Sequence, residues 1–204
     1  MSSIGTLLAG FKAFKAHYFE QRPKLYRALT EAGQQPQAML IACSDSRVDP
    51  AILLNTEPGE LFVVRNVANL VPPYEPDGNY HGTSAALEFA VRDLQVKDIV
   101  VLGHSQCGGV AALRRFAGGA PIDRQFIAPW VSIAATAMEG CRHDAAHEVE
   151  RASVRVSLAN LMTFPWIAEA AGRGALGLHG WWFDIERGEL WGTEPAQQDF
   201  VLLA

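Results

Sequence analysis

The sequence predicts an α/β fold in which a mostly parallel central β-sheet is flanked by helices. Two short, nearly unbroken apolar runs, residues 38–42 and 98–103, are typical of strands buried on both faces. Helical patterns alternate with such runs along the chain, as in parallel sheets. The 204 residues, of which 49% are hydrophobic, suit a single domain with a sizeable core. We expect a helical N-terminal arm over residues 1–35 and an α/β core over residues 36–204.

The remaining elements follow from apolar spacing, turn residues and caps. Pro23 is placed to begin a short helix that ends before Gly33, and Thr83 is placed to cap a later one. The expected elements, in chain order, are helices over 4–19 and 23–32, strands over 38–42 and 60–65, a Pro-rich loop over 72–78, a helix over 83–94, a strand over 98–103, helices over 108–116, 146–163 and 165–171, a strand over 175–185, and a turn over 186–189 that leads into a strand at 190–191.

Charge and cysteine content exclude several classes of protein. The net charge of −5 provides no basic face, so we expect no nucleic-acid partner. Lys12 and Lys15 interrupt the apolar pattern at the N-terminus, which therefore predicts neither a signal sequence nor a membrane span. Three widely spaced cysteines do not indicate a disulfide framework, and thiols kept free for a metal fit a reducing compartment. We expect a cytoplasmic protein with no membrane partner.

Cys43, His104 and Cys107 form a candidate zinc site. Cys43 and His104 each follow a predicted strand, and parallel sheets place ligands at the carboxyl ends of their strands. His104 and Cys107 are three residues apart, so they can share one side of a helical first turn. Two thiolates and an imidazole select zinc, and three protein ligands leave a fourth position for water. The alternative is that the cysteines are ordinary core residues and the histidine caps a helix.

Asp45 and Arg47, just after Cys43, are the candidate catalytic pair. In an extended segment residues i and i+2 point the same way, so the arginine fork can hold the carboxylate. A held, ionised aspartate beside zinc can accept a proton or a hydrogen bond from water at the metal, or it can occupy the fourth position itself. The alternatives are a surface ion pair and a helix cap at Asp45.

Three motifs in order resemble the signature of the β-class carbonic anhydrases. They are Cys43-Ser-Asp-Ser-Arg-Val48, Arg65-Asn-Val-Ala-Asn69 and Gly103-His-Ser-Gln-Cys-Gly-Gly109, and the likeness continues through Val156–Leu161 and Leu178–Asp184. The resemblance implies a carbonate dehydratase, a lyase that reversibly hydrates CO2 to bicarbonate and a proton by attack of hydroxide held on zinc. It implies one Zn2+ per subunit on Cys43, His104 and Cys107, with Asp45 and Arg47 as the catalytic dyad.

Other residues resemble the plant-like branch of this family. Val71-Pro-Pro-Tyr74 matches that branch, as does Gln34, whose counterpart reaches the substrate pocket from the partner subunit. Phe62 and Phe89 align with aromatics of that pocket, although plant-like members have Tyr at the position of Phe89. The resemblance implies that CO2 rests against these rings and that Gln34 or the Gly108 backbone N–H binds one of its oxygens.

The resemblance also bears on regulation and assembly. Leu40 and Ala42 stand where a bicarbonate-inhibited branch has Trp and Gly, so no inhibitory bicarbonate pocket is expected. The N-terminal helices carry more apolar surface than a small sheet needs, and in the family such helices wrap a partner subunit. We therefore expect a homodimer or a higher homo-oligomer. The apolar tail over residues 200–204 either adds a strand to a neighbour or docks on its own subunit.

Two rival functions remain open at this point. One is hydrolysis of CS2 or COS on the same zinc scaffold, and the other is a non-catalytic zinc protein in which Asp45 closes the site. Cys141 is interpreted as a bystander thiol. The pair His143 and His147 has the spacing of a secondary metal site on a helix, but a solvated face is the favoured interpretation.

Overall fold

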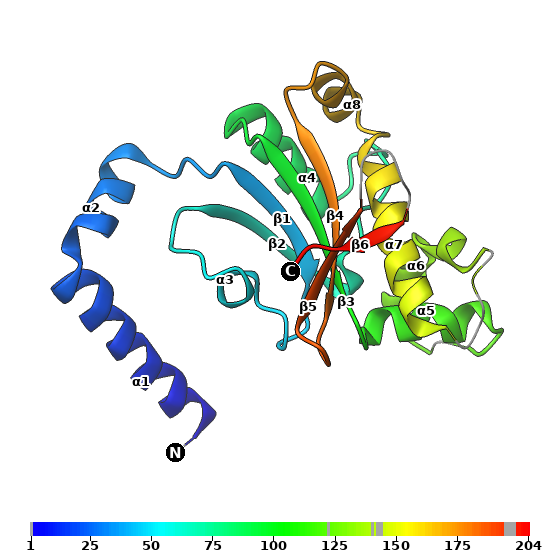
Figure 1. Cartoon of the computed structure of the whole chain (residues 1–204), viewed down its shortest axis with the longest axis horizontal. Coiled ribbons are helices and arrows are strands. Elements are labelled where there is room, and N and C mark those ends of the chain that lie inside the picture. Colours follow the sequence, from blue (N-terminus) through cyan, green and yellow to red (C-terminus); the bar gives the residue numbers. More distant parts are fainter. Residues whose placement is uncertain (1, 122, 140, 142–144, 194–198) are drawn as a thin grey trace. The chain divides into compact units, whose positions relative to one another are not determined.

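The computed structural model describes residues 2–121, 123–139, 141, 145–193 and 199–204, so His143 lies outside the described residues. The chain separates into two compact units, Met1–Gln35 and Pro36–Ala204. The second unit is built on a sheet of order β2-β1-β3-β4-β5-β6, which confirms the expected α/β class (Figure 1). The strands in the described part of the chain are β1 (Ala38–Cys43), β2 (Leu61–Asn66), β3 (Asp98–His104), β4 (Gly177–Asp184), β5 (Glu189–Thr193) and β6 (Phe200–Leu202).

Strand β1 lies between β2 and β3, and its position brings distant parts of the sequence together. The pairings of β1 with β2, β1 with β3, and β3 with β4 are all parallel. Ala42 lies opposite Leu102, so β1 and β3 end side by side at one edge of the sheet. The loops that follow these two strands therefore meet, although about 60 residues separate them in the sequence.

Helices cover the sheet because both of its faces are apolar. Met39 and Ile41 of β1 belong to a buried cluster on one face, while Leu40 and Ala42 belong to a cluster on the other. The long helix α7 packs against β3 and β4. In the described part of the core, the α-helices are α3 (Pro50–Leu53), α4 (Gly82–Glu88), α5 (Gly108–Ala117), α6 (Ile127–Ser132), α7 (Ala146–Leu161) and α8 (Pro165–Gly172).

Three local details differ from the sequence-based expectations. The helix expected over 83–94 is α only to Glu88 and continues as a π-helical turn over Phe89–Asp93. Thr83 does not cap α4, because it lies inside the first turn and accepts a hydrogen bond from Asn66 Nδ2 at 3.3 Å. Helices α3 and α6 were not expected, and both are too short to give a clear periodic pattern.

The C-terminal tail docks on its own subunit. Strand β6 pairs antiparallel with β5, and the chain beyond it exchanges backbone hydrogen bonds with Leu190. The same region holds an aromatic box, formed by three rings around the guanidinium of Arg151. The Arg151 Cζ lies 4.2, 4.7 and 5.8 Å from the ring centroids of Trp182, Trp191 and Phe200. This box joins α7 to β4, β5 and β6.

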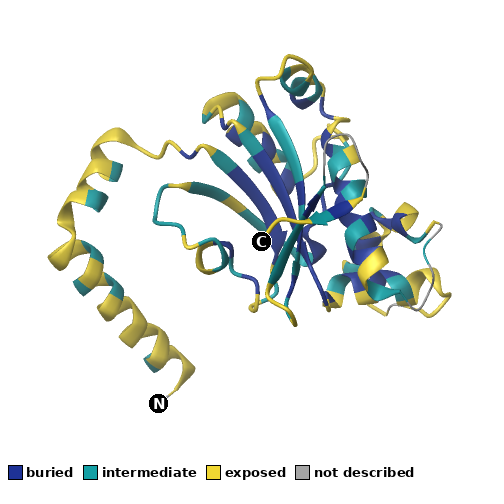
Figure 2. Ribbon diagram, in the orientation of Figure 1, coloured by how far each residue is buried: buried dark blue, intermediate teal, exposed yellow. Residues whose placement is uncertain are grey.

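The N-terminal unit consists of two helices joined by a π-helical turn. Its elements are α1 (Ser3–Lys15), the turn Ala16–Gln21 and α2 (Pro23–Ala32). Contacts among the rings of Phe14, Tyr18, Phe19 and Tyr26 hold it together. None of the residues of α1 is buried, and Leu7 and Phe11 are 69% and 60% exposed (Figure 2). Among the described residues, no helix has the length and apolarity needed to cross a membrane.

Candidate active site

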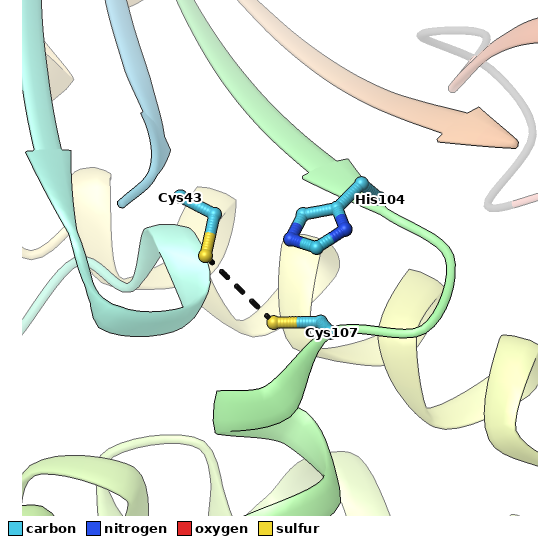
Figure 3. Close-up of side chains that lie close together, drawn as sticks. All are labelled: Cys43, His104 and Cys107. Carbon is cyan, nitrogen blue, oxygen red and sulfur yellow. Dashed lines mark hydrogen bonds between the residues drawn. The ribbon is translucent and has the colours of Figure 1, made fainter. Parts of the chain in front are cut away.

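Cys43, His104 and Cys107 meet at the edge of the sheet where β1 and β3 end. Cys43 and His104 are the last residues of these two strands, and Cys107 is the N-cap of α5. Their ligand atoms all lie within 4.8 Å of one another, and each residue is at most 5% exposed. Figure 3 shows the two sulfur atoms and the imidazole turned toward one another. The spacing suggested that His104 and Cys107 share a helical turn, but they do not. His104 ends a strand and Cys107 caps a helix, and the meeting of these two elements brings the residues together.

The geometry of these three side chains fits zinc. The two sulfur atoms are 3.9 Å apart, and tetrahedral zinc with bonds of about 2.3 Å to sulfur requires about 3.8 Å. His104 Nδ1 lies 2.8 Å from the carbonyl oxygen of Ser105, which assigns the ring proton to Nδ1. The other ring nitrogen, Nε2, is buried, has no hydrogen-bond partner among the described residues, and therefore has a lone pair available for a metal.

The thiols of Cys43 and Cys107 share one hydrogen bond. The hydrogen bond with Cys107 lowers the pKa of the Cys43 thiol to about 4, and the same bond raises the pKa of Cys107. The bond between them thus favours a thiolate at Cys43 and a protonated thiol at Cys107. Because a metal binds both as thiolates, loading this site releases a proton.

Asp45 and Arg47 lie in the turn after Cys43 and are joined by two charge-assisted hydrogen bonds. Arg47 Nε donates to Asp45 Oδ1 at 3.0 Å, and Arg47 Nη2 donates to Oδ2 at 2.7 Å. The segment is not extended, because the backbone N–H of Arg47 also donates to Asp45 Oδ1 at 2.9 Å and closes an Asx turn. These contacts with Arg47 hold the pKa of the Asp45 carboxyl well below its usual range, so the group is ionised at any working pH.

A known protein family accounts for this constellation. The family model described as carbonic anhydrase matches residues 38–190. The chain belongs to the carbonic anhydrase family. It is 42% identical to the carbonic anhydrase of Pseudomonas aeruginosa over 207 aligned positions, which cover 97% of this chain and 91% of that protein.

Solved structures place the chain in the β class of the family. It superposes on the β-carbonic anhydrase CcaA with a TM-score of 0.89 at 32% identity, over 100% of this chain and 93% of that one. The TM-score is 0.79 at 30% identity for a structure from a study of two tetrameric β-carbonic anhydrases of Sordaria macrospora, over 94% of this chain and 99% of that one. As a β-class carbonic anhydrase, the chain is a zinc-dependent carbonate dehydratase, and its Cys–His–Cys cluster can hold one metal ion.

Within the core unit, the residues expected to line the substrate pocket of this carbonic anhydrase do not all lie beside the ligands. Gly108 begins α5 directly after Cys107. Phe62 and Phe89 lie together, with ring centroids 5.9 Å apart, but Phe62 pairs with Met39. Met39 precedes Cys43 by four residues of β1, so the backbone of Phe62 lies about 13 Å along the sheet from that of Cys43, at roughly 3.3 Å per residue. Gln34 belongs to the N-terminal unit.

Arg65 supports the turn that carries the dyad. Its guanidinium donates to the carbonyl oxygens of Cys43 at 3.0 Å and Asp45 at 2.6 Å, and to the carboxylate of Asp49 at 2.8 Å. Asp49, and not Asp45, is the helix cap here, since it accepts from the first N–H groups of α3. The Asp-Pro pair at 49–50 was a sequence signal for this cap.

Glu150 is a contributor that sequence reasoning missed. It lies on α7, is only 3% exposed, and accepts a hydrogen bond from the Cys107 backbone N–H at 3.2 Å. Burial raises the pKa of this carboxyl group. No sequence pattern indicates this contact, because 43 residues separate the two groups and glutamate is common on helix surfaces.

Proposed function

We propose that Cys43, His104 and Cys107 hold the zinc ion of CO2 hydration and that Asp45 and Arg47 are its catalytic dyad. The observation that carries the proposal is the bidentate pairing of Asp45 with Arg47, two residues beyond a buried ligand. When bound, zinc lowers the pKa of a water ligand from ~15.7 towards neutrality and so makes hydroxide available near pH 7.

The protein side chains supply orientation and proton handling. Arg47 keeps the Asp45 carboxylate ionised and fixed, so one of its oxygens accepts a hydrogen bond from the nucleophile. This contact directs the nucleophile's lone pair toward the carbon of CO2. Gly108 is an exposed residue at the N-terminus of α5, and in this proposal its N–H donates to an oxygen of the product.

Asp45→Asn tests the dyad. The ligands remain, so zinc content measured by atomic spectroscopy should stay near one ion per chain. Stopped-flow CO2 hydration should fall by about 10²- to 10⁴-fold, the usual contribution of a positioned acid–base group. Cys107→Ser is the contrasting variant and should lose zinc along with activity. A native hydration rate in Asp45→Asn would remove the dyad from the mechanism.

We further propose that the substrate pocket forms across a subunit interface. Phe62 lies far along the sheet from Cys43 of its own chain, and α1 exposes an apolar surface that the described residues of its own unit leave uncovered. The enzymes of Sordaria macrospora are tetramers, and a homodimer or larger assembly would let one chain supply the wall of another chain's site.

A complementation experiment tests this arrangement. Asp45→Asn and Phe62→Ala chains are purified separately, then unfolded and refolded together. If Phe62 serves its partner's site, the mixed dimer contains one intact site and activity rises above that of either parent. If Phe62 serves its own chain, both sites of the mixed dimer are damaged and no activity returns. Sedimentation velocity on each sample verifies that dimers have formed.

The plant-like branch is our finer assignment. It is supported by Val71-Pro-Pro-Tyr74, whose tyrosine ring lies 5.4 Å from that of Phe164, and by the tightly packed Leu40 and Ala42 at the positions of the bicarbonate-inhibited branch. We expect hydration rates to fall in a simple hyperbolic manner with added bicarbonate at constant ionic strength. A sigmoidal fall would indicate an inhibitory site.

We also propose a reducing compartment, the cytoplasm, as the site of action. Cys43, Cys107 and Cys141 are free thiols in the structure, and the first two must stay reduced to bind metal. Fluorescent tagging in the source cell tests the assignment, and secretion of the active enzyme would contradict it.

A further inference from the structure

Gln106 and Glu186 form a hydrogen-bonded chain that ends at the guanidinium of Arg47. Arg47 Nη1 donates to Gln106 Oε1 at 3.4 Å, and Arg47 Nη2 donates to the backbone oxygen of Gln106 at 3.1 Å. The Gln106 side-chain amide in turn donates to a carboxylate oxygen of Glu186. We propose that Gln106 and Glu186 are positioning residues that hold Arg47, and through it Asp45, in the orientation needed for CO2 hydration.

The side chain of Gln106 suits both of its hydrogen-bond partners, Arg47 and Glu186. Arg47 offers only donors and Glu186 offers only acceptors, so the residue between them must accept on one side and donate on the other. A glutamine does both, and this fixes the orientation of its amide. Glutamate at this position would meet Glu186 with like charge, and a lysine would meet Arg47 with like charge. Gln106 also has a backbone φ of +58°, which is uncommon for a residue other than glycine and aims its carbonyl at Arg47.

The Glu186 end of this series of hydrogen bonds is anchored in the protein core. Glu186 lies in the turn between β4 and β5, and its backbone N–H donates to the Asp184 carboxylate at 3.0 Å. Asp184 is 4% exposed and also accepts from the Ser105 hydroxyl at 3.4 Å. Ser105 Oγ accepts in turn from the N–H of Ile185 at 2.8 Å. The turn carrying Glu186 is thus tied to the segment that carries His104 and Cys107.

This anchoring matters because the dyad itself is exposed. The side chain of Arg47 is 44% exposed, and an exposed ion pair is weakly held and screened by salt. Gln106 accepts from Nη1, which Asp45 leaves free, and from Nη2, which also donates to Asp45. They restrict the arginine to one rotamer and reduce the entropy lost when the carboxylate binds the nucleophile.

The inference rests on the proposed role of Asp45 and Arg47, and its test compares variants of the zinc-loaded enzyme. Glu186→Ala and Gln106→Ala should each lower kcat about three- to tenfold, the effect expected from one lost hydrogen bond. Zinc content should not change. Glu186→Gln keeps an acceptor oxygen and should recover most of the rate. Glu169→Ala, a remote glutamate in a surface ion pair, is the matched control and should behave as wild type.

A second readout reports on Arg47 directly. The Nε–H signal of Arg47 in nitrogen-15 NMR, assigned through Arg47→Lys, should show faster exchange with water in Glu186→Ala than in the control. Combining Glu186→Ala with Arg47→Ala should lower kcat no further than Arg47→Ala alone, since both act through one group.

The outcomes separate this inference from the function it rests on. If Arg47→Ala is inactive but Glu186→Ala leaves both kcat and the Arg47 signal unchanged, the positioning role is refuted and the dyad stands. An additive loss in the double variant also refutes it. If Arg47→Ala itself hydrates CO2 at the native rate, the proposed dyad fails instead.

Discussion

Replacing each of two adjacent glycines at the start of α5 by alanine is expected to change the stability of the protein in opposite directions. A Cβ at Gly109 would lie 2.7 Å from Ala68 Cβ, 2.8 Å from Val67 Cγ1 and 3.2 Å from the Ala68 nitrogen. Carbon atoms pack at about 3.5–4.0 Å, so the neighbouring segment would have to move by roughly 0.8 Å. That segment cannot yield easily, because Ala68 has a φ of 65° and is fixed in the left-handed region. A Cβ at Gly108 would meet no atom within 4 Å.

These distances set the size of the effect. Overpacking costs about 1–3 kcal/mol, and replacing a helical glycine by alanine returns at most about 1 kcal/mol. With that full return, Gly109→Ala should lower the free energy of unfolding by up to about 2 kcal/mol, and Gly108→Ala should leave it unchanged or raise it by up to about 1 kcal/mol. For a chain of this size each kcal/mol shifts Tm by roughly 2–4 °C.

Differential scanning calorimetry of the zinc-loaded variants measures the difference. Protein concentration must be equal in all samples, because assembly and metal binding both raise the apparent Tm. We expect Gly109→Ala to melt several degrees below Gly108→Ala, and its zinc to be lost more readily to a chelator, since Ala68 also contacts the Cys43 sulfur through its N–H. Equal melting temperatures would refute the argument that close approach of Ala68 requires a glycine here.

Three further predictions follow from the core and the loops. Arg151→Ala should lower the free energy of unfolding by about 2 kcal/mol in urea titrations, because it empties the aromatic box, whereas the exposed Arg173→Ala should change it by less than about 0.5 kcal/mol. Hydrogen bonds from the turn that follows Asp77, and then from His81, hold the pKa of Asp77 well below its usual range. The stability that this depressed pKa provides is fully present when the pH is above the pKa of an unfolded aspartate, about 3.9, and it is lost as the pH falls through the pKa of Asp77 in the folded protein. A carbon-13 NMR titration should show that the pKa of Asp77 rises in His81→Ala. Truncation after Asp199 should lower Tm without changing the mass of the assembly, because β6 pairs with β5 of its own chain; a smaller assembly would mean that the tail also serves a neighbour.

The fold class was predictable because hydrophobic patterning in this chain is regular. The runs that became β1 and β3 are apolar on both faces, as buried parallel strands require. The limits of several helices were less predictable. The change from α to π at Phe89, and the short helices α3 and α6, depend on tertiary packing and not on local periodicity.

The site was predictable to the extent that its residue types are chemically unusual. Two cysteines and a histidine at strand ends indicate a metal regardless of fold, and the structure places their ligand atoms together. The groups that support them are common residue types in ordinary positions. Glu150 and Gln106 are joined to the site by hydrogen bonds between segments far apart in sequence, and a single sequence contains no signal for such pairs.

The candidate metal ligands and the pair Asp45 and Arg47 differ in burial, and this difference explains why substitutions around them should have different effects on zinc content and on rate. Cys43, His104 and Cys107 are at most 5% exposed and are positioned by strands and a helix cap, so zinc affinity depends on the packed core. Asp45 and Arg47 are 18% and 44% exposed and are positioned by hydrogen bonds within and around a turn. A substitution in those hydrogen bonds can shift the carboxylate by a fraction of an ångström while the metal stays bound, and in the catalytic role proposed for Asp45 such a shift lowers the rate steeply. Variants that keep full zinc content yet hydrate CO2 slowly should therefore map to the turns over residues 44–49 and 184–188, whereas variants that lose zinc should map to β1, β3 and the start of α5.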